Sequence, residues 1–369
     1  MSSFSSSNRS LETREFNRIL LIKPSSLGDV VHALPVLHGL RVRFPKATVD
    51  WLVGTSFAPL LEGHPEIDEL VPFDRKRYGR MLTSPSAALG FLQFVRMLRK
   101  RRYDLVIDLQ GLFRSGFLSR ASGAPVRIGF RQAREGARTF YTHCLTTDEA
   151  ELHAVDRNYL VAKALGFADV AISFPLPPGD QVSHGVRKLL AANGVGTDCA
   201  YLALAPGARW ETKVWPADHF VQTIEALRSQ RDLAFVLVGG MDEFPICEKI
   251  RSSCGRDVVN LAGKTSLPEL TALVASARAV LCHDSAVAHL AVALERPLVC
   301  LVGPTNPRRT GPYRRLCDVV QLPLDCTPCY FRRITQCPHN HRCMNELPPS
   351  TVVSALRAAV DSQKTLSNR

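Results

Sequence analysis

The stretch RILLIKPSSLGDVVHALP, from Arg18 to Pro35, decides how the fold of this chain is read. It begins with an uninterrupted apolar run, RILLI, of the kind that forms a buried parallel strand. A loop of small residues follows, and an amphipathic helical pattern begins at Gly28 and Asp29. A strand followed directly by a helix is the first half of a βαβ unit, so this stretch predicts a parallel α/β sheet.

The same alternation of apolar strands and helical patterns recurs along the chain, and it occurs in two blocks. The predicted fold class is therefore α/β, with two Rossmann-like domains facing each other across a cleft. A Pro/Gly-rich break, FPLPPGDQ (174–181), separates the blocks. The predicted strands begin at Arg18, Val49 and Tyr103 in the first block, and at Tyr201, Ala234, Val258, Ala279 and Pro297 in the second.

These features predict four segments. They are a disordered N-terminal extension (1–17), a first domain (18–175), a second domain (182–350), and a C-terminal helix with a tail (351–369). The Ser-rich start lacks the apolar region of a signal peptide, and no apolar run reaches the roughly 18 residues of a membrane span. We therefore expect a cytoplasmic protein.

The net charge of +12 is concentrated in one region. Residues 96–138 contain eleven Lys or Arg and three acids. This run is either a solvated helix face with a basic loop, or a surface for an anionic partner such as a phosphorylated lipid, a membrane or nucleic acid. Aromatic residues, 7% of the chain, do not interleave with it, which argues against nucleic acid.

Two motifs are missing from the sequence. No G-x-G-x-x-G follows any predicted strand, which disfavours a dinucleotide-dependent oxidoreductase. No Asp-x-Asp pair occurs that could hold a metal–nucleotide complex. An enzyme acting on a sugar nucleotide would have to neutralise phosphate with side chains and helix ends instead.

Polar residues at the ends of predicted strands are the candidate site residues, because ligands of such sheets bind there. Asp29 is either a helix cap or a general base facing the cleft. Lys213 is either a surface lysine or a phosphate ligand. Asp242 is a helix cap or a partner for ribose hydroxyls. Asp284 and Ser285, at the start of a helix, could form an anion or polyol site with His289, which is otherwise a structural histidine.

Five motifs in order give the chain a family resemblance. They are KPSSLGDVVHALP from Lys23, DLQGLFRSG from Asp108, PGARWETKVWP from Pro206, the stretch from His283 to Pro307, and CTPCYFRRITQCPHNHRCM from Cys326. The chain resembles the lipopolysaccharide heptosyltransferases that use ADP-heptose. The resemblance extends from Arg18 to about Leu356, and it implies a GT-B fold with an acceptor-binding first domain and a donor-binding second domain.

The resemblance also implies an activity and roles for residues. The activity is inverting transfer of a heptose from ADP-L-glycero-β-D-manno-heptose to the inner core of lipopolysaccharide, without metal or cofactor. Asp29 matches the general base, and Ser26, Gln110 and Arg114 match the acceptor side. The residues that match the donor side are Lys213, Asp242, Thr265, Asp284, Ser285 and His289. Glu243, next to Asp242, leaves the register at the ribose open, and Ala286 stands where the family often has glycine.

The expected partners are therefore ADP-heptose and either phosphorylated Kdo-lipid A or a heptosylated core, with peripheral contact at the cytoplasmic face of the inner membrane and no nucleic acid. Three alternatives stay open: a GT-B glycosyltransferase with another donor or acceptor, a sugar-nucleotide 2-epimerase, and a degenerate sugar- or lipid-binding module. The last predicts loss of Asp29, Lys213 or Asp284, and all three are present.

Four of the eleven cysteines cluster in a C-x2-C-x7-C-x5-C pattern: Cys326, Cys329, Cys337 and Cys343, with His339 and His341 between them. The composition is that of a zinc site, but the spacing is looser than in a standard zinc knuckle. We expect these cysteines to be reduced thiols that pack within the protein, or redox-sensitive thiols, rather than metal ligands. The sequence leaves both the thiol reading and the metal reading open.

Overall fold

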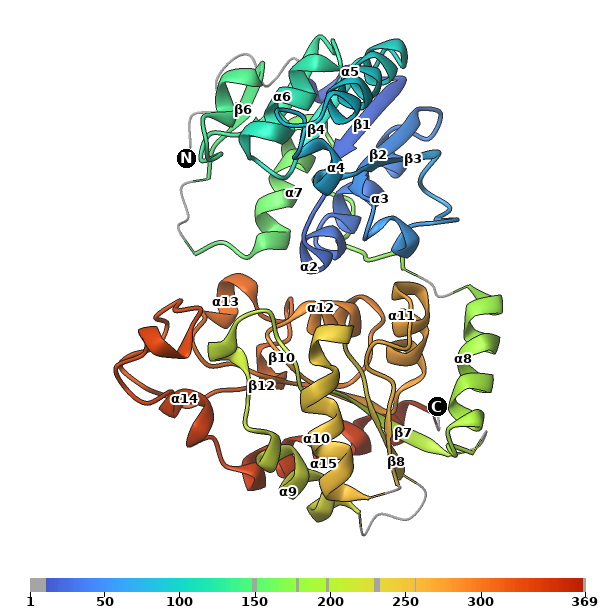
Figure 1. Cartoon of the computed structure of the whole chain (residues 1–369). Coiled ribbons are helices and arrows are strands. Elements are labelled where there is room, and N and C mark those ends of the chain that lie inside the picture. The colour runs from blue at the N-terminus through green and yellow to red at the C-terminus, as the bar shows by residue number, and fades with distance from the viewer. Residues whose placement is uncertain are drawn as a thin grey trace. The chain divides into compact units, whose positions relative to one another are not determined.

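The computed structural model describes residues 11–147, 151–176, 179–196, 199–228, 233–255 and 257–367. The chain forms two compact units, Met1–Leu176 and Pro177–Arg369 (Figure 1). Each unit has its own sheet and its own buried core, so each is described by itself.

Unit 1 is built on a six-stranded sheet of order β3-β2-β1-β4-β5-β6, in which every pair is parallel. The central strands are buried along their length because helices cover both faces, which is why they read as continuous apolar runs. The strands are β1 (Arg18–Ile22), β2 (Thr48–Gly54), β3 (Glu69–Phe73), β4 (Leu105–Asp108), β5 (Val126–Phe130) and β6 (His143–Leu145).

The helices of unit 1 form two groups. In one, α3 packs on α7; in the other, α4, α5 and α6 pack together. A buried cluster that includes Leu20, Ile22, Leu52 and Phe94 joins the second group to the sheet. The helices are α2 (Leu27–Val31), α3 (Leu34–Arg43), α4 (Arg75–Tyr78), α5 (Pro85–Lys100), α6 (Phe113–Ala121) and α7 (Ala154–Leu165).

Unit 2 repeats the plan with a parallel sheet of order β12-β11-β10-β7-β8-β9. Trp215 and Phe220 are fully buried in its core. The strands are β7 (Ala200–Ala205), β8 (Leu233–Leu237), β9 (Val258–Asn260), β10 (Ala279–His283), β11 (Leu298–Leu301) and β12 (Val319–Val320). The helices are α8 (Asp180–Ala192), α9 (Ala217–Leu227), α10 (Phe244–Cys254), α11 (Leu267–Ser276), α12 (Ala286–Ala293), α13 (Pro307–Thr310), α14 (Arg342–Asn345) and α15 (Pro349–Ser367).

Both sheets reverse their winding between two neighbouring central strands. In unit 1 the chain runs outward from β1 to β3, and then returns to place β4 on the other side of β1. In unit 2 the same reversal lies between β7 and β10. The loops that leave such a pair of strands diverge and open a crevice, so these two switch points are where a ligand is expected.

The two parallel sheets confirm the predicted α/β fold class, and some boundaries differ from the prediction. Leu11 and Phe16 are buried, so unit 1 includes part of the segment predicted as a disordered extension. Residues 1–10 of that extension and the last two residues of the tail lie outside the described residues. The C-terminal helix begins at Pro349 rather than at Thr351. Among the described residues, no helix has the length and apolar character to cross a membrane.

Candidate functional site

The loop after β1 holds Asp29 by a local hydrogen-bond pattern. Asp29 is the third residue of α2, and its Oδ2 accepts hydrogen bonds from the backbone N–H and the hydroxyl of Ser26, both at 2.8 Å. Lys23 Nζ lies 3.5 Å from Asp29 Oδ1. The carboxylate is thus oriented from two sides, while 43% of its side chain remains exposed.

The loop after β4 is joined to the loop after β1 across the switch point of unit 1. The buried Lys23 ammonium donates to Leu109 O at 2.8 Å, and the Ser25 N–H donates to Gln110 Oε1 at 3.3 Å. Ser26, Asp29 and Gln110 therefore lie on two loops that contact each other. Arg114, the other predicted acceptor residue, is exposed in the first turn of α6, which begins just beyond the Gln110 loop.

Asp108 organises the Gln110 loop from beneath. Its Oδ1 accepts the N–H groups of Gln110 and Gly111 at 2.8 and 3.1 Å, and its Oδ2 accepts the Tyr141 hydroxyl at 2.7 Å. Burial raises the pKa of the Asp108 carboxyl, and the hydrogen bonds it accepts oppose that rise. Gly129 makes room for Tyr141, because a Cβ there would stand 2.3 Å from the ring.

Lys213 and Asp284 form a buried ion pair at the switch point of unit 2. Lys213 Nζ donates to Asp284 Oδ2 at 2.7 Å and to Asp284 O at 2.8 Å. The side chains are 14% and 3% exposed. Thr305 Oγ1 also donates to Asp284 Oδ2, at 2.7 Å, so the carboxylate is well compensated. The Lys213 ammonium also lies 4.8 Å from the centre of the Trp210 ring.

The loop that carries Lys213 is held by the cysteine-rich segment. His341 Nε2 lies 2.7 Å from Thr212 O, and the Thr212 hydroxyl donates to Phe331 O. The Arg332 guanidinium lies 5.0 Å from the centre of the Trp210 ring, and the Lys213 ammonium packs on the same ring. A segment more than a hundred residues further along the chain thus fixes the position of the lysine loop.

His283, at the end of β10, is a neutral structural histidine. Its Nε2 accepts the Trp215 N–H at 2.9 Å, and its Nδ1 lies 3.3 Å from Gly207 O. Accepting at Nε2 requires that nitrogen to be unprotonated, so Nδ1 carries the proton and donates to the carbonyl. Burial lowers the pKa of His283 to about 4.

The loop after β8 presents Glu243 rather than Asp242 to the sheet edge. Glu243 Oε2 accepts the Gly240 N–H at 2.7 Å. A Cβ on Gly207, which follows β7, would meet the Glu243 carboxyl at 2.4 Å, so that glycine makes room for the side chain. Burial raises the pKa of Glu243, whereas Asp242 is exposed. The carboxylate beside the strand ends is therefore that of Glu243, and not that of the predicted Asp242.

The remaining predicted donor residues lie at the same edge of the second sheet. Thr265 is half-buried in the loop after β9, which is tied to the β8 loop by the bond from Gly263 N–H to Gly239 O at 2.9 Å. Ser285 precedes α12, with its hydroxyl oxygen buried, and His289 is buried within that helix.

The cysteine-rich segment has clustered thiols but no arranged metal site. Burial raises the pKa of Cys343 to about 11, and the neighbouring thiols of Cys329, Cys337 and Cys326 add to that rise. Across the described ranges, no group of three or more His, Cys, Asp or Glu side chains is arranged to hold a metal ion.

Sequence reasoning missed the supporting residues of both sites. The residues that position the predicted ones are not among those that the sequence predicts: Lys23, Asp108, Tyr141 and His283. Lys23 and Asp108 carried a usable signal, because each is a charged residue at the end of an apolar strand run. Tyr141 carried none, since its contact with Asp108 depends on the pairing of β4 with β5.

Comparisons with known proteins relate this chain to one family. The profile of glycosyltransferase family 9 (heptosyltransferase) matches residues 91–339. The chain is 31% identical to lipopolysaccharide heptosyltransferase 1 of Pseudomonas aeruginosa, over 95% of this chain and 99% of that protein. It is 29% identical to lipopolysaccharide heptosyltransferase 2 of Escherichia coli K12, over 83% of this chain and 88% of that one.

A solved structure with similar sequence has the same fold. The E. coli heptosyltransferase WaaC, solved with ADP, superposes with a TM-score of 0.71 at 27% identity, and the match covers 93% of this chain and 99% of that one. The two parallel six-stranded sheets described above are therefore those of a GT-B heptosyltransferase structure.

Proposed function

Because this chain belongs to glycosyltransferase family 9, the heptosyltransferases, we propose that it moves a heptose from ADP-L-glycero-β-D-manno-heptose to the inner core of lipopolysaccharide. The observation that supports this most is the likeness to a lipopolysaccharide heptosyltransferase along 95% of the chain. The ADP bound to the similar WaaC structure supports an ADP-linked donor. The proposed acceptor is either Kdo-lipid A or a core that already carries one heptose.

In the proposed reaction the acceptor hydroxyl oxygen attacks C1 of the heptose. The bond from C1 to the diphosphate oxygen breaks, ADP leaves with the electron pair, and the configuration at C1 is inverted. Asp29 takes the hydroxyl proton. Its two hydrogen bonds from Ser26 hold the carboxylate in a fixed direction, and its 43% exposure leaves it accessible to a substrate. Ser26, Gln110 and Arg114 are proposed to bind the acceptor.

The donor is proposed to bind unit 2 at its switch point. Lys213 uses two of its three N–H bonds on Asp284, which leaves the third for a phosphate oxygen. Lys213, together with the N–H groups at the start of α12, would stabilise the charge that develops on the departing diphosphate. Ser285 and His289 would contact the sugar and diphosphate, and Thr265 the nucleotide. This arrangement needs no metal or cofactor.

Glu243 is proposed as the partner of the ribose hydroxyls, in place of Asp242. Its carboxyl group lies against Gly207 and Gly239, which follow β7 and β8, whereas Asp242 is exposed. In nucleotide-binding α/β sheets an acidic side chain near the strand ends accepts hydrogen bonds from ribose.

The enzyme is proposed to work at the cytoplasmic face of the inner membrane, because its proposed acceptor is anchored there by lipid. It would associate with that surface peripherally.

The function is tested by measuring ADP release from ADP-heptose with each of the two acceptors. Release should require one acceptor and so identify it. Asp29→Asn should lower kcat by about 10²- to 10⁴-fold, because the asparagine keeps an acceptor oxygen for Ser26 but cannot take a proton. The matched control is Asp169→Asn, which changes an exposed carboxylate of the same unit. Folded enzyme that releases no ADP with either acceptor would exclude the proposed activity.

A further inference from the structure

Two cations from distant parts of the chain lie on one aromatic ring in unit 2. The Lys213 ammonium is 4.8 Å from the centre of the Trp210 ring, and the Arg332 guanidinium is 5.0 Å from the same centre. Contact with an aromatic ring stabilises each cation, but two positive charges held near each other also repel. An anion bound beside both of them would relieve that repulsion.

The charge of Lys213 is already compensated, whereas that of Arg332 is not. Lys213 donates to the buried carboxylate of Asp284 at 2.7 Å. Arg332 is exposed, and among the described residues no ion pair joins its guanidinium to a carboxylate. Glu211, in the same loop as Lys213, accepts the backbone N–H of Ile334 at 3.2 Å instead. Arg332 is therefore the cation at this ring whose charge is open to a ligand.

The backbone that carries Arg332 is held against both loops of the Lys213–Asp284 ion pair. On one side, the Tyr330 N–H donates to Pro304 O, in the loop after β11, at 2.9 Å. On the other side, Phe331 O accepts the hydroxyl of Thr212, in the Lys213 loop. The guanidinium thus extends from a fixed backbone to a fixed ring, so little order has to be gained when it binds a ligand.

A buried hydroxyl group beside the ion pair has no partner within the described part of the chain. Ser285 directly follows Asp284, and its hydroxyl oxygen is buried without a hydrogen bond there. Buried polar groups of proteins are nearly always hydrogen-bonded, so a partner from outside the chain is expected at this position. Ser285 also stands at the start of α12, whose first N–H groups favour a negative charge.

The charge balance of the proposed donor site requires a second cation. Lys213 and Asp284 together carry no net charge, while the diphosphate of a sugar nucleotide carries a negative charge on each phosphate group. The start of a helix supplies only about half a positive charge. An arginine on the same ring as Lys213 supplies a full one, and its planar fork can donate two hydrogen bonds to one phosphate group.

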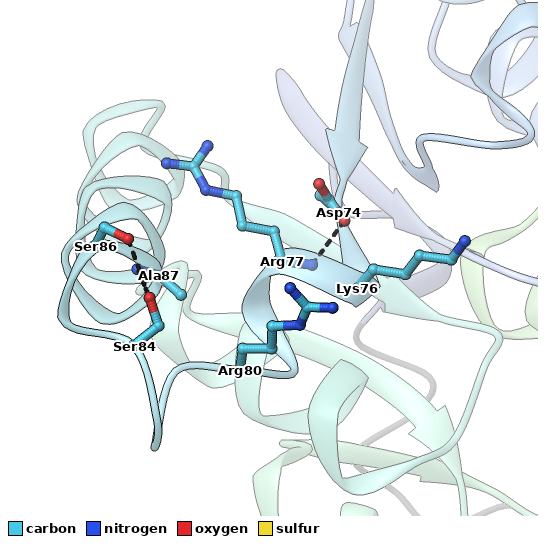
Figure 2. Close-up of a pocket in the computed structure, with 7 residues that line it drawn as sticks. All are labelled: Asp74, Lys76, Arg77, Arg80, Ser84, Ser86 and Ala87. Atoms are coloured by element: carbon cyan, nitrogen blue, oxygen red, sulfur yellow. Dashed lines mark hydrogen bonds between the residues drawn. The ribbon is translucent and has the colours of Figure 1, made fainter.

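A second group of closely spaced cations lies in unit 1 and is built differently. Lys76, Arg77 and Arg80 line a hollow of about 420 Å³ and project from α4 and the turn that follows it, with Asp74 among them (Figure 2). Of these two groups, the one at Trp210 is the group in the unit that is proposed to bind the donor.

We propose that Arg332 is a further ligand of the donor diphosphate, and that the Trp210 ring positions its guanidinium beside Lys213. Arg332 adds a positive charge where negative charge develops as ADP leaves. The cysteine-rich segment then takes part in donor binding directly, in addition to holding the Lys213 loop. This inference rests on the proposed function, because it assigns one more residue to the same donor site.

The test is calorimetric titration with ADP and with adenosine, in the absence of acceptor. Arg332→Gln should weaken ADP binding roughly 10- to 100-fold, because a charge-assisted contact with phosphate is lost. It should leave adenosine binding unchanged, since adenosine has no phosphate group. Arg332→Lys should weaken ADP binding less than Arg332→Gln does, because lysine keeps the charge but loses the planar fork.

The matched control is Arg333→Gln, which removes the exposed charge of the next residue in the same segment and should bind ADP as the wild type does. The role of the ring is tested with Trp210→Leu. In that background Arg332→Gln should weaken ADP binding by a smaller factor than it does in the wild type, because the ring that positions the guanidinium is absent. Unfolding midpoints would verify that each variant is folded.

Three results would overturn the role of Arg332. They are equal ADP binding by wild type and Arg332→Gln, an equal loss of ADP and adenosine binding, and an equal loss in Arg333→Gln. The second would show a change in the shape of the pocket, and the third a general effect of charge. Failure of the proposed function looks different: the wild type would bind ADP, and Arg332→Gln would weaken that binding, but no ADP would be released from ADP-heptose with either acceptor. Wild-type enzyme that does not bind ADP would overturn both.

Discussion

At the residue scale, the proposed roles of Asp29 and Asp284 follow from their different surroundings. The Asp284 side chain is 3% exposed and accepts hydrogen bonds from Lys213 and Thr305. Its charge is therefore needed to hold the lysine in place. Asp29 is 43% exposed and is oriented by Ser26, so a substrate hydroxyl can reach it. A general base must contact the group it deprotonates, and that requirement favours Asp29.

The buried histidine of unit 2 predicts how stability depends on pH. The pKa of His283 is about 4 in the folded chain, against 6.5 for a free side chain. Between these values the unfolded chain binds a proton that the folded chain does not, so stability falls as the pH falls. We expect His283 to account for about 2 kcal/mol of the stability lost between pH 7 and pH 5.

Urea unfolding at both pH values, for wild type and His283→Gln, checks this contribution. Glutamine keeps a donor and an acceptor but does not titrate, so the variant should lose less stability on acidification. The control is His184→Gln, which changes an exposed histidine of the same unit and should behave as the wild type does. Equal pH dependence in wild type and His283→Gln would contradict the prediction.

At the scale of elements, short loops at the strand ends carry the proposed chemistry and other segments hold those loops. Lys23 joins the loops after β1 and β4, and Asp108 holds the β4 loop from beneath. In unit 2 the cysteine-rich segment supports the Lys213 loop through His341 and Thr212. A loop fixed in this way pre-organises its charged group, which lowers the cost of ordering it when the substrate binds.

The loop after β8 gives a test that separates two adjacent carboxylates. Glu243→Gln should raise the KM for ADP-heptose, or the Kd for ADP, by roughly 10- to 100-fold, because hydrogen bonds to a charged acceptor contribute about 1.5 to 3 kcal/mol. Asp242→Asn should change both by less than about twofold, since that side chain points to solvent. Calorimetric titration with ADP measures the difference. Equal effects of the two substitutions would contradict the assignment of the ribose contact to Glu243.

At the scale of the whole molecule, two units with separate cores divide the proposed substrates between them. All proposed donor residues, from Lys213 to His289, lie in unit 2, whereas Ser26, Asp29, Gln110 and Arg114 lie in unit 1. Each set stands at the switch point of its own sheet or in a loop beside it. One sheet topology, used twice, thus supplies a place for each substrate.

This division predicts where ADP alone protects the chain. Hydrogen exchange measured at an ADP concentration of about 100 times its Kd, where binding adds about 2.7 kcal/mol, should slow mainly in the loops of unit 2. The loops concerned are 206–216, 239–243, 261–266 and 284–289. The segment 23–29 of unit 1 should be slowed only when an acceptor is added. Strong protection there by ADP alone would assign part of the donor site to unit 1.

The sequence by itself determined the α/β class and most central strands, because a strand buried on both faces must be apolar throughout and its pattern is therefore local. It also indicated Asp29, Lys213 and Asp284 as candidates, since each lies in a loop that follows a predicted strand. The strands it missed are mostly short edge strands. β3 contains Pro72, and β6 and β12 are three and two residues long, so none of them shows a buried apolar run.

Only the tertiary structure decided which residues support the site. Lys23 and Leu109 are 86 residues apart, Lys213 and Asp284 are 71 apart, and His341 and Thr212 are 129 apart. These contacts exist because the order of the strands places the loops side by side, and local periodicity does not encode that order. The preference for Glu243 over Asp242 has the same origin: neighbouring residues of one turn point in different directions, and only Gly207 of another loop shows which of them faces the site.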